Sequence, residues 1–472
     1  MLFNTWQFGI FLPCVLVLYY CMTRHMQNRM LLLASYVFYS WWDWRFTGLL
    51  MLSTVVDFHL SLAIHNADSQ RSRKRFLLLS IILNLGVLAF FKYFNFFVDS
   101  AAHVIQVLGF QANLPVLRII LPAGISFYTF QTMNYTIDVY RRQMEPTRDF
   151  LTYALFVAYF PHLVAGPIIR AEVLLPQLLN KRTVADRHLR TGAVLILLGL
   201  FKKVAIADTL APDVERFFTA PGNCSSLVLV KGVYFFCLQI YCDFSGYTDI
   251  ARGVSRLLGI ELPENFNQPY LARNISEFWR RWHISLSTWL RDYLYIPLGG
   301  NRVGRWRTYR NLFITMLLGG LWHGANWTFV VWGGLHGSYL AVHKFIAELR
   351  PGASRAAPSR VMTVLGVLAT FHLVALTWIF FRAPSFRLAF DYLAGIVRWH
   401  GGFSVTQLVV PAAYFAIVLA IDLPQYRSKD HTVILSAPWF VRGFAYAGMV
   451  TLIALANTGH AIPLHSRVLF LH

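Results

Sequence analysis

Charged residues are scarce in this chain. They make up 14% of its 472 residues, whereas hydrophobic residues make up 56%, and the mean hydropathy is +0.49. Soluble domains typically contain about 25% charged residues, so the composition excludes a protein whose whole surface faces water. The sequence therefore indicates an integral membrane protein. No polar stretch of domain size interrupts the apolar runs, which argues against nucleic acid as a partner.

Acidic residues are outnumbered, at 22 against 42 lysines and arginines, which gives a formal net charge of +20. In so apolar a chain, the excess of basic residues is expected in cytoplasmic loops that face anionic membrane lipid. The chain has five cysteines and no CxxC pair, which favours small buried residues over a disulfide or metal site. HExxH, GxSxG, Walker A and GxGxxG patterns are also absent, so no metal and no permanently bound cofactor is predicted.

Apolar runs long enough to cross a bilayer, at about 17–25 residues each, recur along the chain. They lie near residues 6–23, 30–42, 46–64, 76–98, 119–140, 150–168, 191–210, 227–250, 312–343, 361–381, 407–423 and 440–457. The sequence thus predicts an all-α polytopic membrane protein with about 11–13 membrane helices and re-entrant segments. We interpret residues 1–472 as one domain, with a motif-bearing core at about 30–345 and C-terminal membrane helices at about 361–457.

The basic residues predict which loops are cytoplasmic. The positive-inside rule places loops 66–75, 180–190, 251–310 and 346–360 inside, and loops 99–118 and 211–226 outside. Strict alternation would put 180–190 outside, so we interpret 150–179, which contains several prolines, as a re-entrant segment. The same logic makes 312–343 a re-entrant hairpin or two short passes. Irregular backbone at membrane depth requires protein or a water-filled cavity around it, so the break at 150–179 predicts a cavity.

Polar motifs concentrate between residues 241 and 343. The first, at 241–249, contains Asp243 at the end of an apolar run. In the second, at 274–289, Asn274 or Ser276 is expected to cap a helix, and Glu277 to reach Arg280 or Arg281. On one continuous helix, His283 would share a face with Arg280 and Ser287. The alternative for this stretch is an amphipathic interfacial helix anchored by its tryptophans.

His323 lies in an apolar stretch, with Gly319 and Gly320 before it and Gly324 after it. Most membrane histidines are hydrogen-bonded packing residues, and we interpret His59, His162, His336 and His372 in this way. His323 differs because the glycines are expected to leave room for a donor and an acceptor, and because a second motif histidine precedes it. A neutral imidazole can act as a general base without burying a fixed charge, and intramembrane ionisable groups often mark functional sites.

These segments resemble the membrane-bound O-acyltransferase family. The resemblance rests on residues 241–249, 280–287, 298–302 and 321–324, with further matches at 126–131, 135–140 and 164–167. It covers about residues 30–345 and is strongest to the bacterial branch that contains the membrane subunit of alginate O-acetyltransferase. It implies a ring of membrane helices around a central funnel, with His323 as the catalytic histidine and His283 as the second motif histidine.

The resemblance also implies an activity, partners and a location. An acyl group, acetyl by this family's example, would move from a cytoplasmic thioester donor, acetyl-CoA or an acyl carrier, to an acceptor outside. The setting would be a bacterial inner membrane, and an extracytoplasmic acetyltransferase partner would pass the group to a polysaccharide such as alginate. His323 would deprotonate the attacking hydroxyl, while His283 would either polarise the carbonyl or orient the donor. Candidate substrate-binding residues are Arg280, Arg281, Ser287, Asp243, Asn326 and Trp322.

Two other functions stay open from the residues alone. A transporter or flippase for a polysaccharide or lipid-linked sugar would show repeats with paired broken helices, and the chain has breaks but no visible repeat. A processive glycosyltransferase would need an acidic metal-binding motif in a soluble domain, and neither is present. For each arginine near the motifs, ordinary positive-inside loop charge is the alternative to binding a phosphate-bearing donor.

Overall fold

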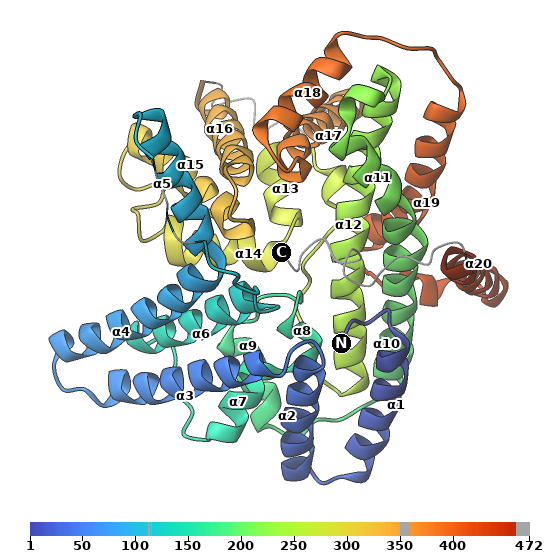
Figure 1. The fold of residues 1–472 in the computed structure, drawn as a ribbon. Coiled ribbons are helices and arrows are strands. Elements are labelled where there is room, and N and C mark those ends of the chain that lie inside the picture. Colours follow the sequence, from blue (N-terminus) through green and yellow to red (C-terminus); the bar gives the residue numbers. More distant parts are fainter. Residues whose placement is uncertain (112–113, 115, 350–358, 459–472) are drawn as a thin grey trace. The chain divides into compact units, whose positions relative to one another are not determined.

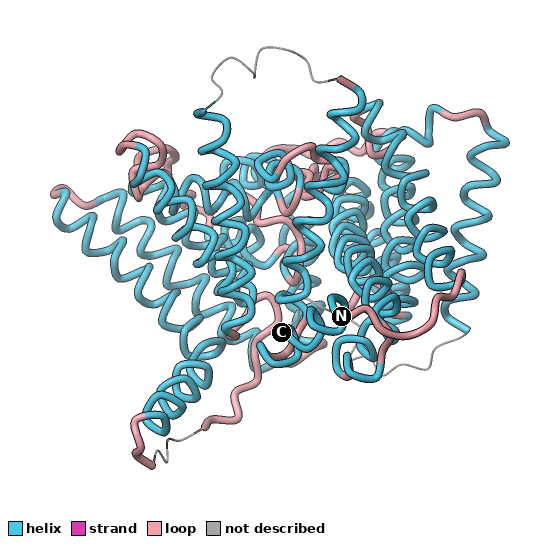
Figure 2. The backbone as a smooth tube through the Cα atoms, turned by 90° about the horizontal axis from the view of Figure 1, so that it is seen from above, coloured by secondary structure: helices cyan, strands magenta, loops and turns pink. Residues whose placement is uncertain are grey.

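The computed structural model describes residues 1–111, 114, 116–349 and 359–458, and every regular element within these ranges is a helix (Figures 1 and 2). Six described stretches are long and apolar enough to cross a membrane: Arg45–Asn66, Gln70–Val107, Ser226–Leu257, Arg360–Arg382, Thr406–Ser428 and Trp439–Asn457. The helix Trp6–Cys21 is apolar but shorter, and the other predicted runs form short or broken helices. The predicted all-α polytopic membrane class is therefore confirmed.

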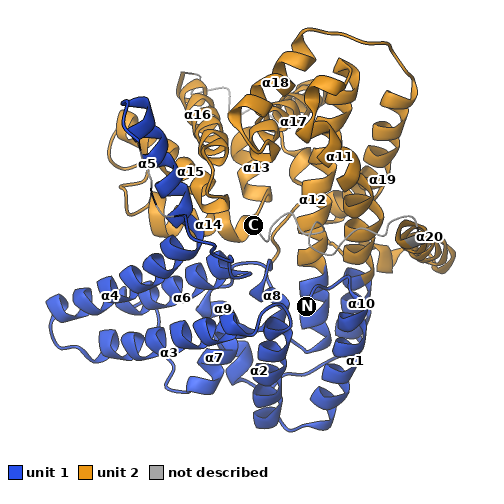
Figure 3. Cartoon of the chain, viewed as in Figure 1, with its two compact units in different colours: residues 1–196, 250–263, 470–472 blue, residues 197–249, 264–469 orange. Residues whose placement is uncertain are grey.

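The chain divides into two compact units, shown in different colours in Figure 3. Within the described ranges, unit 1 is made of residues from 1–196 and 250–263, and unit 2 of residues from 197–249 and 264–458. The interpretation of the chain as one functional domain stays a prediction.

Unit 1 contains α1 (Trp6–Cys21), α2 (Arg24–Ser40), α3 (Arg45–Asn66), α4 (Gln70–Leu88), η1 (Ala89–Tyr93), α5 (Phe94–Val107), α6 (Ile125–Tyr140), α7 (Phe150–Ala158), α8 (Phe160–Leu163), α9 (Ala171–Leu179) and most of α10 (Asp186–Leu200). Unit 2 contains η2 (Phe201–Asp208), α11 (Thr209–Thr219), η3 (Pro221–Asn223), most of α12 (Ser226–Leu257), η4 (Pro269–Leu271), α13 (Ile275–Arg281), α14 (Ile284–Leu290), η5 (Arg291–Tyr295), α15 (Arg305–His323), α16 (Trp327–Leu349), α17 (Arg360–Arg382), α18 (Phe386–Val397), α19 (Thr406–Ser428), η6 (Val433–Ser436) and α20 (Trp439–Thr458).

Polar side chains satisfy one another where α3, α4 and α6 of unit 1 pack together. The Asp57 carboxylate is buried and accepts hydrogen bonds from Ser80 Oγ at 2.7 Å and from Asn84 Nδ2 at 2.8 Å. Thr132 Oγ1 on α6 donates to Asn84 Oδ1 at 3.1 Å. Because an unpaired polar group is costly where water is absent, this network favours one arrangement of the three helices.

Two predicted spans of unit 1 have different boundaries in the structure. The run at 76–98 belongs to a helical stretch from Gln70 to Val107, so part of the predicted outer loop 99–118 is helical. The predicted start of the run at 119–140 is wrong, because α6 begins only at Ile125. Gly124 precedes it with a φ of +72°, and a Cβ there would lie 2.4 Å from the Leu163 carbonyl oxygen. This close approach requires glycine at position 124, and the helix starts only after it.

The run at 150–168 is broken, as its prolines and glycine predicted. α7 ends at Ala158, α8 has four residues, and non-helical chain then leads to α9. Residues 152–169 are all buried. Protein therefore covers this irregular backbone, as membrane depth requires. Its return to the cytoplasmic side stays a prediction.

The predicted break in the run at 312–343 is also confirmed. α15 ends at His323, α16 begins at Trp327, and the two form an antiparallel hairpin within unit 2. A Cβ on Gly320 would lie 2.2 Å from the Phe329 carbonyl oxygen, and one on Gly333 would lie 2.2 Å from that of Met316. Glycine thus lets the two backbones approach more closely than a residue with a side chain would allow.

The hairpin contact predicts different effects for two neighbouring glycines. Gly333→Ala should lower the stability by about 1–3 kcal/mol, because the new methyl group overlaps a backbone atom. Gly334→Ala is the matched control, since its Cβ would meet no atom closer than 3.6 Å. Thermal melting of the detergent-solubilised variants measures both. Equal melting temperatures for the two variants would contradict close packing at Gly333.

Candidate active site

The motif segment 274–289 forms two short helices and not the continuous helix that the sequence suggested. Asn274 caps α13, with its Oδ1 accepting from the Glu277 backbone nitrogen at 2.9 Å. α13 ends at Arg281, and His283 follows with a φ of +43° before α14 begins. The expectation that His283 shares a helix face with Arg280 and Ser287 is therefore wrong, because the helix axis is interrupted between them.

His283 is fully buried in unit 2. Its Nδ1 lies 3.2 Å from Asn265 Oδ1, and the Phe244 ring contacts it edge-on with centroids 4.6 Å apart. Burial lowers the pKa of the His283 imidazole to about 3. The ring is therefore neutral at physiological pH, as accepting a proton or a hydrogen bond requires.

His323 is the last residue of α15 and is partly exposed. Its ring centroid lies 6.4 Å from that of His283. Aromatic rings surround it, with centroids at 5.0 Å for Trp322, 5.1 Å for Trp332 and 5.4 Å for Phe381. Unit 2 thus brings together the two motif histidines, which lie far apart in sequence, inside an aromatic environment.

The glycines that flank His323 do not leave the space expected from the sequence. A Cβ on Gly324 would lie 2.2 Å from the Phe329 ring, and one on Gly319 would lie 3.1 Å from a Leu290 methyl group. Gly320 contacts the α16 backbone, as described above. These glycines serve close packing of protein against protein, so the room predicted for donor and acceptor at these positions is occupied.

The predicted substrate-binding residues lie in varied surroundings. The Arg280 side chain is exposed, whereas Arg281 binds Glu277 at 2.8 Å and donates to the Asn267 carbonyl at 3.0 Å. Ser287 Oγ donates to the Trp282 carbonyl at 3.1 Å. Glu277 thus pairs with Arg281, one of its two expected partners, and also with Arg273 at 3.0 Å.

Asn326, Asp243 and Trp322 complete this set. Asn326 Oδ1 accepts from the Thr328 backbone nitrogen, and its Nδ2 donates to the Pro384 carbonyl, both at 3.0 Å. Asp243 forms an ion pair with Lys203 at 2.6 Å. The Trp322 ring is buried, with its centroid 6.0 Å from that of His283. Substrate binding by all six residues stays a prediction, and the contacts of Asn326 and Asp243 give each a structural role as well.

The four other membrane histidines form the hydrogen bonds expected of packing residues. His336 Nδ1 accepts from Trp279 Nε1 at 3.2 Å, and its Nε2 lies 2.9 Å from Thr377 Oγ1. In unit 2, Tyr234 donates to His372 Nε2 at 3.0 Å. In unit 1, His162 Nε2 lies 2.8 Å from Gln131 Oε1, and His59 Nδ1 lies 2.8 Å from the Val55 carbonyl.

Buried ion pairs join α12 to the π-helical segment η2. Lys202 Nζ lies 2.8 Å from Asp249 Oδ2, and each side chain is 4% exposed. Lys203 Nζ lies 2.7 Å from Asp208 and 2.6 Å from Asp243. Isolated charges would be very costly here, so each lysine depends on its acidic partners and each aspartate on its lysine.

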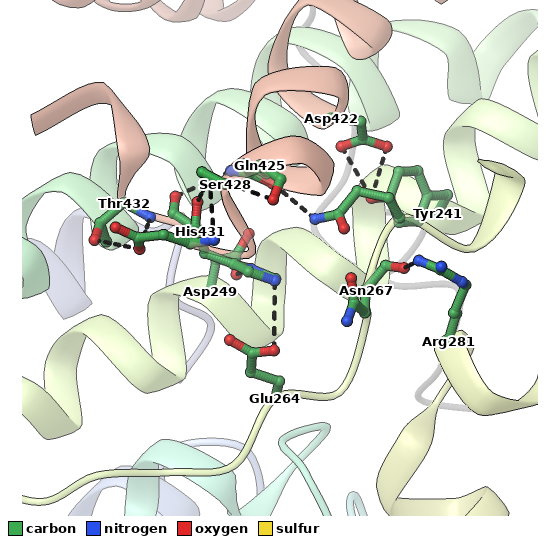
Figure 4. A network of polar contacts seen from close by, with 12 residues as sticks. Tyr241, Asp249, Glu264, Asn267, Arg281, Asp422, Gln425, Ser428, His431 and Thr432 are labelled. Atoms are coloured by element: carbon green, nitrogen blue, oxygen red, sulfur yellow. Dashed lines mark hydrogen bonds and ion pairs between the residues drawn. The ribbon is translucent and has the colours of Figure 1, made fainter. Parts of the chain in front are cut away.

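The C-terminal part of unit 2, which matched no motif, contributes to this region (Figure 4). Tyr241 on α12 donates to the buried Asp422 carboxylate on α19, at 3.0 and 3.1 Å. His431, just after α19, lies 3.9 Å from Asp249 and 3.7 Å from Glu264. α19 therefore packs against the polar motif at 241–249 and hydrogen-bonds to it. Sequence reasoning missed Asp422 and His431, although a carboxylate within an apolar run was a signal that could have indicated Asp422.

The Lys202–Asp249 pair predicts that removing one partner destabilises the protein more than removing both. Lys202→Met should reduce folded protein and cost about 3–5 kcal/mol of stability, because it leaves a carboxylate buried without its partner. Adding Asp249→Leu should restore part of the loss. Arg387→Met is the control, since its pair with Asp391 is exposed and 3.9 Å long. Yield and thermal melting in detergent measure all three, and a single variant as stable as the double variant would contradict the pairing.

Comparison with known proteins shows which family and which relatives this chain resembles. A model of the membrane-bound O-acyltransferase family matches residues 36–383. The protein named probable alginate O-acetylase from Pseudomonas aeruginosa is 46% identical over 381 residues, which cover 80% of this chain and 71% of that protein. Peptidoglycan O-acetyltransferase from Helicobacter pylori is 36% identical over 472 residues, covering 93% and 87%. Teichoic acid D-alanyltransferase from Bacillus subtilis is 27% identical over 292 residues, covering 59% and 72%.

A polytopic helical fold together with these relatives defines a membrane enzyme that transfers acyl groups. The chain belongs to the membrane-bound O-acyltransferase family, because the family match covers well over half of its length. It is thus an O-acyltransferase and a multi-pass membrane protein.

Proposed function

We propose that this enzyme takes an acyl group, acetyl in the first instance, from a cytoplasmic thioester and transfers it across a bacterial inner membrane for O-acetylation of a polysaccharide such as alginate. The observation that carries the proposal is the pairing of His283 and His323, whose ring centroids lie 6.4 Å apart in a chain of this family. The names of the bacterial relatives support a polysaccharide as the acceptor. Alginate is named first because the relative named alginate O-acetylase is more similar to this chain than the peptidoglycan O-acetyltransferase is.

The proposed chemistry uses the partly exposed histidine as the base. His323 accepts the proton of the attacking hydroxyl as its oxygen forms a bond to the thioester carbonyl carbon. The carbon–sulfur bond then breaks, and the thiolate leaves with the donor and is protonated to a thiol. The aromatic rings around His323 support this role, because they hold its imidazole in place, and general-base catalysis needs a positioned side chain.

Donor binding on the cytoplasmic side is proposed from the basic residues of the 251–310 segment. Acetyl-CoA and acyl carriers carry phosphate groups, and arginine binds phosphate with paired hydrogen bonds. The Arg280 side chain is exposed and so offers such a group within the motif segment 274–289. A transporter or flippase would need neither a histidine pair nor the acyltransferase family match, so we favour the enzyme.

His323→Ala should lower acyl transfer by about 10²–10⁴-fold, the range that general-base catalysis contributes. The variant should keep normal membrane abundance and melting, because the side chain is partly exposed. His372→Ala is the matched control, since His372 is an exposed histidine of α17. Transfer from radiolabelled acetyl-CoA in reconstituted vesicles gives the rate. Near-normal transfer by His323→Ala, or loss of activity only through loss of protein, would contradict the base assignment.

We further propose that an extracytoplasmic acetyltransferase partner receives the acyl group and modifies the polymer. The order of the helices supports this proposal, because no described segment between them forms a soluble domain that could hold a long polysaccharide. In vesicles that contain both proteins, acyl label should appear on the partner before it appears on polymer. Full polymer acetylation by this chain alone would contradict the relay.

A further inference from the structure

Asn265 lies in the loop between α12 and α13 and is 1% exposed. Its side-chain oxygen contacts three groups of the motif segment. Oδ1 lies 3.1 Å from the Ser285 backbone nitrogen, 2.9 Å from Ser285 Oγ and 3.2 Å from His283 Nδ1. The Asn265 backbone takes part as well, because its carbonyl accepts from the Ile284 nitrogen at 2.9 Å. One residue therefore holds His283 and the first turn of α14.

The Ser285 backbone determines which way the Asn265 amide faces. A backbone N–H can only donate, so the Asn265 atom that faces it must be the oxygen and not the nitrogen. The same oxygen faces His283 Nδ1, which must therefore carry a proton to complete a hydrogen bond. In a neutral imidazole, the lone pair then lies on the other ring nitrogen, Nε2.

The surroundings of His283 keep the ring neutral. Its ring neighbours are Phe244 at 4.6 Å, Trp322 at 6.0 Å, His323 at 6.4 Å and Phe266 at 6.5 Å between centroids. His323 is the titratable group among these rings. Together with full burial, this environment disfavours the imidazolium, so the tautomer and not the charge decides what His283 can do.

We propose that Asn265 is a positioning residue that holds His283 in the Nδ1–H tautomer, with the lone pair on Nε2. The inference rests on the proposed acyl transfer. Of the two roles that the sequence left open for His283, polarising the thioester carbonyl from Nε2 would require an N–H there, which this tautomer lacks. His283 in this tautomer instead acts as a hydrogen-bond acceptor at Nε2 and orients the groups beside His323.

The tautomer can be measured directly by ¹⁵N NMR of the full chain labelled with ¹⁵N-histidine in detergent. Subtraction of the His283→Ala spectrum isolates the His283 signals. We expect a protonated Nδ1 and an unprotonated Nε2 in the unmodified protein and in Asn265→Asp, which keeps an oxygen acceptor. Asn265→Leu removes the acceptor and should lose this preference. A protonated Nε2 in the unmodified protein would overturn the proposal.

Activity provides a second readout. Loss of folding would lower the rate, but it would not produce the expected difference between the Leu and Asp variants or a shift of the pH–rate profile. Asn265→Leu should lower transfer at least about 10-fold, as expected when a histidine is left free to adopt the wrong tautomer. Asn265→Asp should recover transfer and move the acidic limb of the pH–rate profile to higher pH, because a carboxylate beside Nδ1–H raises the pKa of the ring. Ser285→Ala, which keeps the backbone N–H, should leave the tautomer unchanged.

The outcomes separate this inference from the proposed function. Asn265→Leu with an unchanged tautomer and unchanged transfer would overturn the positioning role. Equal losses of melting temperature and activity in the Leu and Asp variants, without a pH shift, would also overturn it. If no acyl transfer is detected for the unmodified protein while the Nδ1–H tautomer is observed, the proposed function fails and the assignment of the tautomer still holds.

Discussion

Ion pairs between α12 and η2 decide how unit 2 is assembled. Lys202, Lys203, Asp243 and Asp249 are almost wholly buried, and each would be strongly disfavoured without a partner of opposite charge. Their pairing fixes the rotation of α12 relative to η2. The same helix presents Phe244 to His283 and Tyr241 to Asp422, so the position of the motif histidine depends on the pairing of these charges.

Close packing provides the second constraint. The α15–α16 hairpin brings its backbones together at Gly320 and Gly333, and His323 lies at the tip of that hairpin. Trp332 on α16 then lies against His323, with ring centroids 5.1 Å apart. A histidine at a helix end, with aromatic rings on its sides and glycine-mediated packing beneath it, has little freedom to move, and a pre-organised catalytic group requires such restraint.

The C-terminal helices α17 and α19 have a structural part in this arrangement, although the sequence analysis found no motif in them. α17 supplies Phe381, which contacts His323, and Thr377, which hydrogen-bonds His336. α19 supplies Asp422 to Tyr241. A family motif therefore marks only some of the residues that hold the site, because supporting contacts can be made by many side chains of suitable size and polarity.

The sequence by itself determined the membrane class, most of the long helices, the breaks near 159 and 324, and the two motif histidines, because these depend on local hydropathy, helix-breaking residues and short motifs. It could not determine that the helix stops between Arg281 and His283, or that Asp243 pairs with Lys203. Nor could it show that Phe329 occupies the space beside the glycines near His323. It also gave no sign of Asn265 as the partner of His283. Those features arise from contacts between segments far apart in the chain, and only the tertiary structure decides which side chains meet there.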